Sequence, residues 1–214
     1  MKIITTNDGS HSLYNHLINE RYHSVHGAIS ESMHVFINEG MKHYKSKNLK
    51  ILEIGFGTGL NTFLTLENMG SRNIQYTTLE PFPVNYDIIK KLNYSQLSKN
   101  SNKFLELHRC IWNKKIKITN KFIFYKHNNR IQDFITENNF NIIYFDAFSP
   151  NRQSEIWEYK VLKKCYNLLS INGFLVTYCA KGVIKRRLKK VGFKIEILSG
   201  PPGKREMIRA VKIN

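Results

Sequence analysis

The sequence predicts an α/β fold, with a doubly wound, mostly parallel sheet covered by helices on both faces. From residue 49 onward, short apolar runs alternate with longer amphipathic stretches, as in successive βα units. A glycine-rich turn at 55–59 separates the first predicted strand from the first predicted helix. The last two predicted strands are joined by a turn at 200–203, which is too short to connect parallel neighbours, so the last strand must run antiparallel.

The elements follow from the spacing of apolar residues along the chain. Strands are expected at 49–54, 74–79, 116–118, 122–125, 141–145, 174–179, 193–198 and 206–213, with a hairpin-like excursion at 116–125 and seven strands in the main sheet. Helices are expected at 58–69, 84–92, 131–138, 155–169 and 183–191.

The first 48 residues have a different pattern, and we expect them to form a cap segment packed on the same domain as 49–214. A turn is expected at 7–10, and the apolar residues between 22 and 44 have helical spacing, which predicts an N-terminal helical cap. With 214 residues, 42% of them hydrophobic, the chain is long enough for one domain with a sizeable core.

The charge balance indicates a polyanionic partner. The chain has 33 Lys and Arg against 16 Asp and Glu, a net charge of +17, and such a field attracts nucleic acid. The alternative explanation is coding bias toward lysine, which leaves the excess charge as solvated surface. Basic residues are dense at 181–190 and at 204–205, so we expect a phosphate-binding face in the C-terminal half.

The cysteines and the N-terminus predict a location and exclude some partners. Cys110, Cys165 and Cys179 lie far apart without metal-binding spacing, so we expect reduced thiols and no metal site. The N-terminus lacks a signal-peptide pattern, and no stretch reaches the roughly 18 apolar residues of a membrane span. We therefore expect a cytoplasmic protein that binds no membrane and has no stable protein partner, while the oligomeric state stays open.

The glycine loop and the next strand end predict a nucleoside-containing cofactor. Gly55, Gly57 and Gly59 lie between a strand and a helix, where glycines let the backbone approach a ligand. The dinucleotide fingerprint requires glycine at position 60, which is Leu60, and no Walker lysine follows. This spacing favours S-adenosylmethionine over NAD, FAD or a nucleoside triphosphate. Glu80 ends the second strand, about 20 residues after the loop, where an acid accepts ribose hydroxyls.

A carboxylate at the end of another buried strand is the candidate catalytic group. Asp146 follows the apolar run 141–145, at the edge where open α/β sheets bind ligands. An alkylammonium has a pKa near 10 by analogy with lysine, so a carboxylate that accepts its N–H protons would help it present a lone pair to a sulfonium methyl group. Phe148 is expected to stack on a base or to face the cationic centre. The alternative role for Asp146 is capping of the following turn.

Five motifs in order resemble the methyltransferase domain of the bacterial tRNA 5-aminomethyl-2-thiouridine methyltransferases, and together they cover nearly the whole chain. They are Asp8-Gly9-Ser10 with the run 20–32, the loop 55–61, the strand end 79–83, Asp146-Ala147-Phe148-Ser149-Pro150 with 155–157, and 182–188 leading to 203–207. The resemblance implies a Rossmann-like methyltransferase domain at 49–214.

The resemblance also implies an activity and a set of site residues. The activity is methyl transfer from S-adenosylmethionine to the aminomethyl group of uridine 34 in the tRNA anticodon arm. The implied groups are Asp146 and Phe148 for catalysis, then Glu53, Gly55, Gly57, Gly59, Asn61 and Glu80 for the cofactor, and Tyr22, His23, Glu31, Pro150, Lys185, Arg186, Arg187, Lys204 and Arg205 for substrate or RNA. The flavin-dependent oxidase half of the bifunctional relatives has no counterpart here, so we expect methylation alone, with no flavin and no metal.

One stretch departs from the pattern of such methyltransferases. After the strand ending near Tyr125, many of them have an acid that reads the adenine amino group, whereas this chain has His127-Asn128-Asn129. We expect an oxygen of Asn128 or Asn129, or a backbone carbonyl, in that role.

Two other functions are compatible with the residues. The first is an S-adenosylmethionine-dependent N-methyltransferase of a small amine or a protein side chain, which would use the same glycine loop and Asp146. The second is a non-catalytic protein that binds RNA or S-adenosylmethionine.

Overall fold

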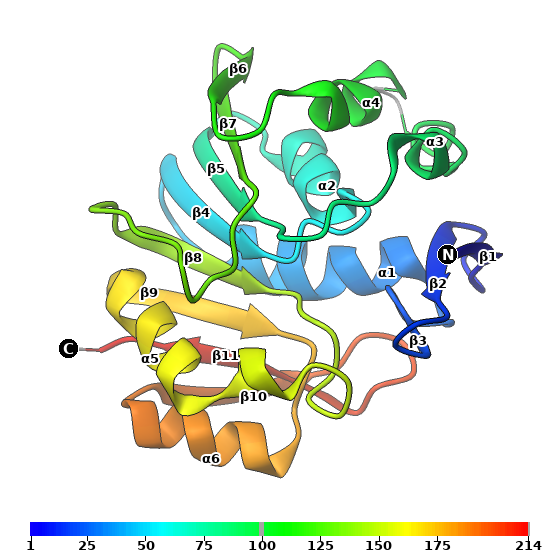
Figure 1. The fold of residues 1–214 in the computed structure, drawn as a ribbon. Helices are drawn as coiled ribbons and strands as arrows, with labels where there is room; N and C mark the ends of the chain where they lie inside the picture. The colour runs from blue at the N-terminus through cyan, green and yellow to red at the C-terminus, as the bar shows by residue number, and fades with distance from the viewer. Residues whose placement is uncertain (99–100, 214) are drawn as a thin grey trace.

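The computed structural model describes residues 1–98 and 101–213, and its centre is a twisted sheet of eight strands (Figure 1). The strand order is β10-β11-β9-β8-β4-β5-β7-β6. These strands are β4 Asn48–Ile54, β5 Asn73–Leu79, β6 Lys115–Thr119, β7 Phe122–His127, β8 Phe140–Phe145, β9 Leu169–Thr177, β10 Lys194–Ser199 and β11 Glu206–Val211. Strands β9, β8, β4, β5 and β7 are parallel, and β4 and β8 are neighbours at the point where the strand order reverses. The doubly wound, mostly parallel sheet is therefore confirmed.

The antiparallel strand near the C-terminus is confirmed as well, and the sheet gains one strand beyond the predicted seven. Strand β11 pairs antiparallel with both β9 and β10. The additional strand is β6, which pairs antiparallel with β7 at the opposite edge. An edge strand needs only one neighbour and can leave alternate residues exposed, so its short apolar pattern did not indicate membership of the main sheet.

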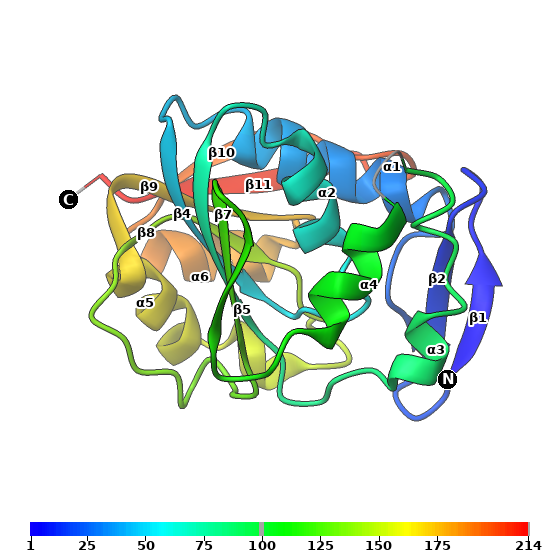
Figure 2. The ribbon, with the colours of Figure 1, turned by 90° about the horizontal axis from the view of Figure 1, so that it is seen from above.

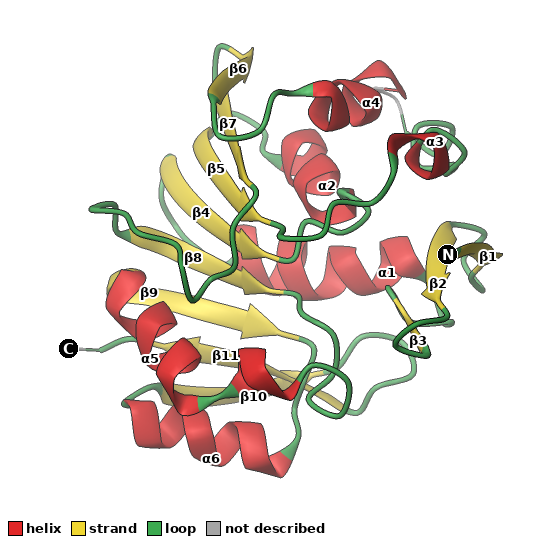
Figure 3. Ribbon diagram, viewed as in Figure 1, coloured by secondary structure: helices red, strands yellow, loops and turns green. Residues whose placement is uncertain are grey.

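Helices cover both faces of the sheet (Figure 3). They are α1 Ala28–Ser32 with the wider-wound η1 Met33–Met41, α2 Leu60–Asn68, α3 Tyr86–Ile89, α4 Ser101–Arg109, the short turn η2 Ser154–Trp157, α5 Tyr159–Leu168 and α6 Gly182–Val191. The first apolar layer lies between the sheet and α1, η1, α2 and α4, and includes Phe36, Phe63 and Tyr144. The second lies under α5 and α6 and includes Trp157 and Leu188.

One predicted helix is absent, and one observed helix was not predicted. The segment 131–138 forms a turn and a loop, because only Ile131 and Phe134 are buried while Ile135 is 92% exposed. Conversely, α4 forms in a segment for which no element was predicted, and it packs on α2 through Phe104 and Leu107, which are both buried.

The N-terminal segment contains the predicted helix, over 28–41, but it begins with a small antiparallel sheet that was not predicted. Its strands are β1 Lys2–Thr5, β2 His11–Asn15 and β3 Glu20–Arg21, joined as β1-β2-β3. Asp8, in the predicted turn, accepts hydrogen bonds from the backbone N–H and the hydroxyl of Ser30, both at 2.9 Å, and so caps α1 from a distance in sequence. The small sheet lies beyond the carboxyl ends of the parallel strands (Figures 1 and 2). Among the described residues, no helix has the length and hydropathy to cross a bilayer.

A buried arginine connects the N-terminal helix to β10 and β11, the last two strands at one edge of the sheet. Arg209 on β11 is 3% exposed. Its guanidinium pairs with Glu39 on η1 at 2.6 Å and with Glu196 on β10 at 2.9 Å. The N-terminal helix and the last two strands thus share one charge cluster.

We expect Arg209→Ala to lower the free energy of unfolding by about 3 kcal/mol, because two carboxylates lose their partner and a cavity is left. Urea unfolding followed by circular dichroism measures the change. The exposed Lys189→Ala on α6 is the control, with an expected change within about 0.5 kcal/mol. Equal stability of the two variants would show that the cluster contributes nothing.

Candidate active site

A cavity of about 490 Å³ opens at the carboxyl ends of β4, β5 and β8. Open α/β sheets bind ligands at this edge, where the strand order reverses. Eight predicted site residues line it, namely Tyr22, His23, Gly55, Gly57, Asn61, Glu80, Asp146 and Phe148. Residues from the hairpin β2–β3 form another side of the cavity.

The glycine loop and the segment after β8 are in direct contact. Gly55 has φ +94°, and a Cβ atom there would lie 2.4 Å from the backbone oxygen of Asp146. The Gly55 N–H donates to the carbonyl of Leu79 at 3.0 Å, and the Asp146 N–H donates to the carbonyl of Ile54 at 3.0 Å. Only glycine can occupy position 55 without moving one of the two segments.

Glu80 joins the second strand end to the glycine loop. Its Oε2 accepts the Gly57 N–H at 3.0 Å, and its Oε1 accepts the Phe82 N–H at 2.9 Å. Burial raises the pKa of Glu80, while the two N–H donors lower it. Each carboxylate oxygen keeps a further lone pair, so the side chain can still accept two hydroxyl groups of a ribose.

Asp146 is held by a neighbour from the glycine-loop helix. Asn61 on α2 donates from Nδ2 to Asp146 Oδ2 at 2.7 Å. Burial raises the pKa of Asp146 to about 7, a shift that the Asn61 hydrogen bond opposes. No described residue donates a hydrogen bond to the other oxygen, Oδ1, which leaves it able to accept a proton donor from a ligand.

The residues that follow Asp146 are fixed through their backbone. The Ala147 carbonyl accepts the Tyr178 hydroxyl at 2.8 Å, and the Phe148 carbonyl accepts the Trp157 indole N–H at 2.8 Å. The Phe148 ring packs edge-on against Tyr22, with 5.0 Å between ring centroids. Tyr178 was missed from the sequence, although an aromatic residue just past the end of a central strand was a usable signal.

The other three predicted cofactor residues, Asn61, Gly59 and Glu53, differ in where they lie relative to the cavity. Asn61 lines the cavity, and its Oδ1 is buried with no hydrogen-bond partner among the described residues, as is Oγ1 of the neighbouring Thr58. Gly59 precedes α2 with φ +74°, and the space beside it is filled by His108. Glu53 is buried beneath the loop, away from the cavity, and accepts the Thr62 hydroxyl at 2.9 Å. Burial raises the pKa of Glu53 to about 8, so it is largely neutral near pH 7.

The two asparagines that were predicted to contact the adenine, Asn128 and Asn129, differ in their surroundings. The Asn128 amide nitrogen, in the orientation that satisfies its neighbours, donates to the carbonyls of Glu80 and Pro81 at 3.1 and 3.2 Å. Asn129 lines the cavity. Asn129 is therefore the better placed of the two to contact an adenine.

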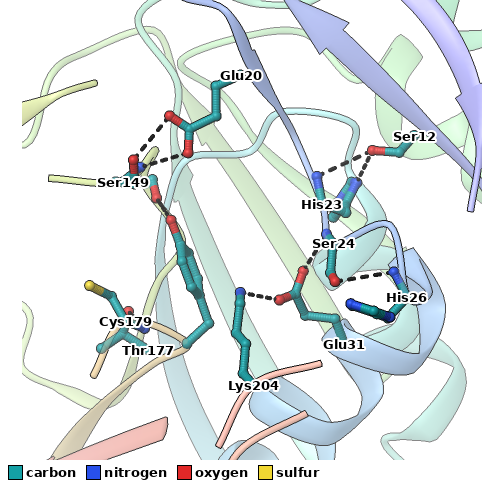
Figure 4. Close-up of polar contacts among 12 residues, drawn as sticks. Ser12, Glu20, His23, Ser24, His26, Glu31, Ser149, Thr177, Cys179 and Lys204 are labelled. Carbon is teal, nitrogen blue, oxygen red and sulfur yellow. Dashed lines mark hydrogen bonds and ion pairs between the residues drawn. The ribbon is translucent and has the colours of Figure 1, made fainter. Parts of the chain in front are cut away.

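The predicted substrate residues separate into two groups. Tyr22, His23, Glu31 and Lys204 surround a second cavity beside the first, and three of them are labelled in Figure 4. The remaining five, Pro150, Lys185, Arg186, Arg187 and Arg205, line neither cavity.

Two basic residues of the predicted RNA face are engaged within the fold. Lys185 forms an ion pair with Glu206, and Arg187 donates to the Trp157 carbonyl at 3.0 Å. On this face Arg186 and Arg205 are the exposed arginines. Among the described residues, no group of three or more His, Cys, Asp or Glu is arranged to hold a metal ion.

The cavity has the form of a methyltransferase cofactor site. A glycine loop follows the first parallel strand, an acid ends the second, and unpartnered polar atoms of Thr58 and Asn61 remain beside the opening. These groups fit S-adenosylmethionine, whose methionine end needs polar partners and whose ribose needs a carboxylate. Fold and site thus define a class, the S-adenosylmethionine-dependent methyltransferases.

Comparison with known proteins gives the family. A family profile described as "S-adenosyl-L-methionine-dependent methyltransferase" matches residues 89–213, more than half of the chain. The chain belongs to this family, and its cofactor is S-adenosylmethionine.

Curated relatives match most of this chain but only part of their own length. The tRNA 5-methylaminomethyl-2-thiouridine biosynthesis bifunctional protein MnmC of Leptospira interrogans is 28% identical over 208 residues, which are 87% of this chain and 32% of the relative. The protein of the same name from Campylobacter hominis is 26% identical over 212 residues, with 92% of this chain and 31% of the relative covered. The chain thus spans about a third of the length of these relatives.

A solved structure shares the fold. MNMC2 from Aquifex aeolicus matches with a TM-score of 0.81 and 22% identity, over 100% of this chain and 70% of that chain. At this identity the likeness shows the fold alone.

We expect Gly55→Ala to lower methyl transfer at least 100-fold, because the new Cβ atom displaces the Asp146 backbone and a shift of about 1 Å at reacting groups costs that much. Gly70→Ala is the matched control. Gly70 also has positive φ, +59°, but no atom lies within 4 Å of the added Cβ. Both variants therefore pay a backbone cost of roughly 1 kcal/mol, and only Gly55→Ala meets the catalytic segment. Equal loss of activity in the two would contradict the contact, and kcat measured at saturating cofactor distinguishes the outcomes.

Proposed function

We propose that this chain transfers a methyl group from S-adenosylmethionine to the aminomethyl nitrogen of 5-aminomethyl-(2-thio)uridine at wobble position 34 of tRNA. The observation that carries the proposal is the Asp146 carboxylate, which lines the cavity beside the glycine loop with one oxygen available to an amine. The names of the MnmC relatives support the substrate, since they refer to 5-methylaminomethyl-2-thiouridine biosynthesis.

The chemistry requires removal of one proton before methyl transfer. The cofactor supplies a methyl group bound to a positively charged sulfur. The substrate ammonium gives up one proton, and its nitrogen lone pair forms a bond to the methyl carbon while the electrons of the carbon–sulfur bond pass to sulfur. The products are a secondary ammonium, S-adenosylhomocysteine and the released proton.

Asp146 is suited to accept that proton. With a pKa raised to about 7, it is a stronger base than an exposed aspartate and is still about half ionised at neutral pH. The Asn61 hydrogen bond fixes one oxygen and so directs the other toward the incoming N–H groups. Phe148, held edge-on by Tyr22, provides an aromatic surface next to the carboxylate on which a pyrimidine can stack.

The tRNA partner is supported by charge and by the enclosed site. The net charge of +17 favours a polyanionic substrate. A base must leave any stack to reach Asp146 in the cavity, which suits a wobble nucleotide of the anticodon arm that is already unpaired and can be turned outward at low cost. A cytoplasmic location follows from such a substrate.

Methyl transfer into bulk tRNA tests the proposal. The protein is incubated with labelled S-adenosylmethionine and tRNA from a strain that lacks this activity, and nucleosides are identified by mass spectrometry. We expect 5-methylaminomethyl uridines to appear as their aminomethyl precursors disappear. Tight cofactor binding without label in tRNA would favour a small amine or a protein side chain as the acceptor.

We expect Asp146→Asn to lower kcat by a factor of about 100 to 10,000, the usual contribution of a general base, while binding of S-adenosylhomocysteine is retained. Because burial raises the pKa of Asp146 to about 7, the ionised base is gained as the pH rises through that value. The kcat/KM of the wild type should therefore increase across pH 6–8, and this inflection should be lost in the variant.

The exposed Asp133→Asn is the matched control and should keep both the rate and the pH profile. Full activity of Asp146→Asn would remove Asp146 from the mechanism. Calorimetric titration with S-adenosylhomocysteine separates loss of catalysis from loss of folding.

A further inference from the structure

A second cavity of about 820 Å³ lies directly beside the first. Arg21, Tyr22, His23 and Tyr178 line both of them, so the two cavities share one wall. The second cavity contains neither the glycine loop nor Asp146. It therefore extends the site on the acceptor side, away from the residues that hold the cofactor.

Contacts between the two ends of the chain build this cavity (Figure 4). Glu31 on α1 is 6% exposed, accepts the Ser24 N–H at 2.8 Å and forms an ion pair with Lys204. The Lys204 ammonium lies 3.8 Å from the centroid of the Tyr178 ring. These contacts fix the segment before α1 against the loop between β10 and β11.

The charge that remains in the second cavity is positive. Both of its carboxylates are engaged, since Glu31 is paired as above and Glu20 accepts the Ser149 hydroxyl at 3.0 Å and lies 3.8 Å from the Arg152 Nε. The lining also contains the exposed side chains of Lys2, His16, Arg21 and His26. The Arg21 guanidinium forms no ion pair with any residue that the structure describes.

We propose that the second cavity binds the ribose-phosphate backbone that flanks the acceptor uridine, with Arg21 contacting a phosphate where the two cavities meet. This inference rests on the proposed function. A nucleotide whose base enters the first cavity must place its phosphates within a few ångströms of the opening, and a guanidinium is the best side-chain partner for a phosphate. A small amine brings no anion to this position.

Arg21→Gln tests the inference against Lys121→Gln. Both changes remove one exposed positive charge, but Lys121 lies in the turn before β7, at the amino ends of the parallel strands and so opposite the cavities. Binding of tRNA is measured over a range of KCl concentrations, together with kcat and KM for tRNA, methylation of the free nucleoside 5-aminomethyluridine, and binding of S-adenosylhomocysteine.

We expect Arg21→Gln to reduce the slope of log K against log[KCl] by about 0.7–0.9, the value for one lost phosphate contact. Its KM for tRNA should rise roughly tenfold, while kcat, nucleoside methylation and S-adenosylhomocysteine binding stay unchanged. Lys121→Gln should leave the slope unchanged. Lys2→Gln, at another exposed position of the same cavity, should also raise the KM for tRNA.

Three outcomes would overturn the inference. An unchanged slope in Arg21→Gln, or an equal fall in both variants, would show that tRNA does not contact this cavity through Arg21. An equal loss on free nucleoside and tRNA would place Arg21 in the first cavity instead. If the wild type methylates tRNA, any of these three results overturns the inference and leaves the proposed function intact. If the wild type neither binds nor methylates tRNA, the proposed function fails and the inference fails with it.

Discussion

The candidate site depends on the parallel pairing of β4 with β8. This pairing brings two loops to the same edge of the sheet, so that the Gly55 backbone lies directly against the Asp146 backbone. Two further contacts complete the junction, one from Asn61 to Asp146 and one from Gly57 to Glu80. The loops on the cofactor side and the acceptor side are therefore in direct contact. A displacement of one of these loops displaces the others directly.

The part of the site made by successive βα units was predictable from the sequence. Carboxyl ends of parallel strands meet at one edge, so Gly55, Glu80 and Asp146 could be placed together without coordinates. The role of Glu53 could not, because it depends on which way a side chain points at a strand end. Glu53, one residue before the end of β4, contacts Thr62 of α2 and does not line the cavity.

The elements that were missed depend on contacts that local pattern does not contain. Strand β3 has two residues, and it forms by pairing with β2 and through the contact of Glu20 with Ser149. Helix α4 owes its position to packing on α2. The predicted basic face shows the same limitation, because a count of charges gives the sign of the electrostatic field but not which charges are paired. In the structure Lys185 forms an ion pair with Glu206, and Lys204 forms one with Glu31.

Desolvation of Asp146 and Glu53 destabilises their ionised forms in the folded protein, and contacts elsewhere in the fold must compensate for this loss of stability. Burial raises the pKa values of Asp146 to about 7 and of Glu53 to about 8, above the usual range near 4. Between these limits the folded protein binds more protons than the unfolded chain, so these two groups contribute less stability as the pH rises from about 4 to 8. The same desolvation makes Asp146 a stronger base than an exposed aspartate, which the proposed proton transfer from the substrate ammonium requires. Ion-pair clusters such as that of Arg209, remote from the cavity, stabilise the framework that keeps these groups buried.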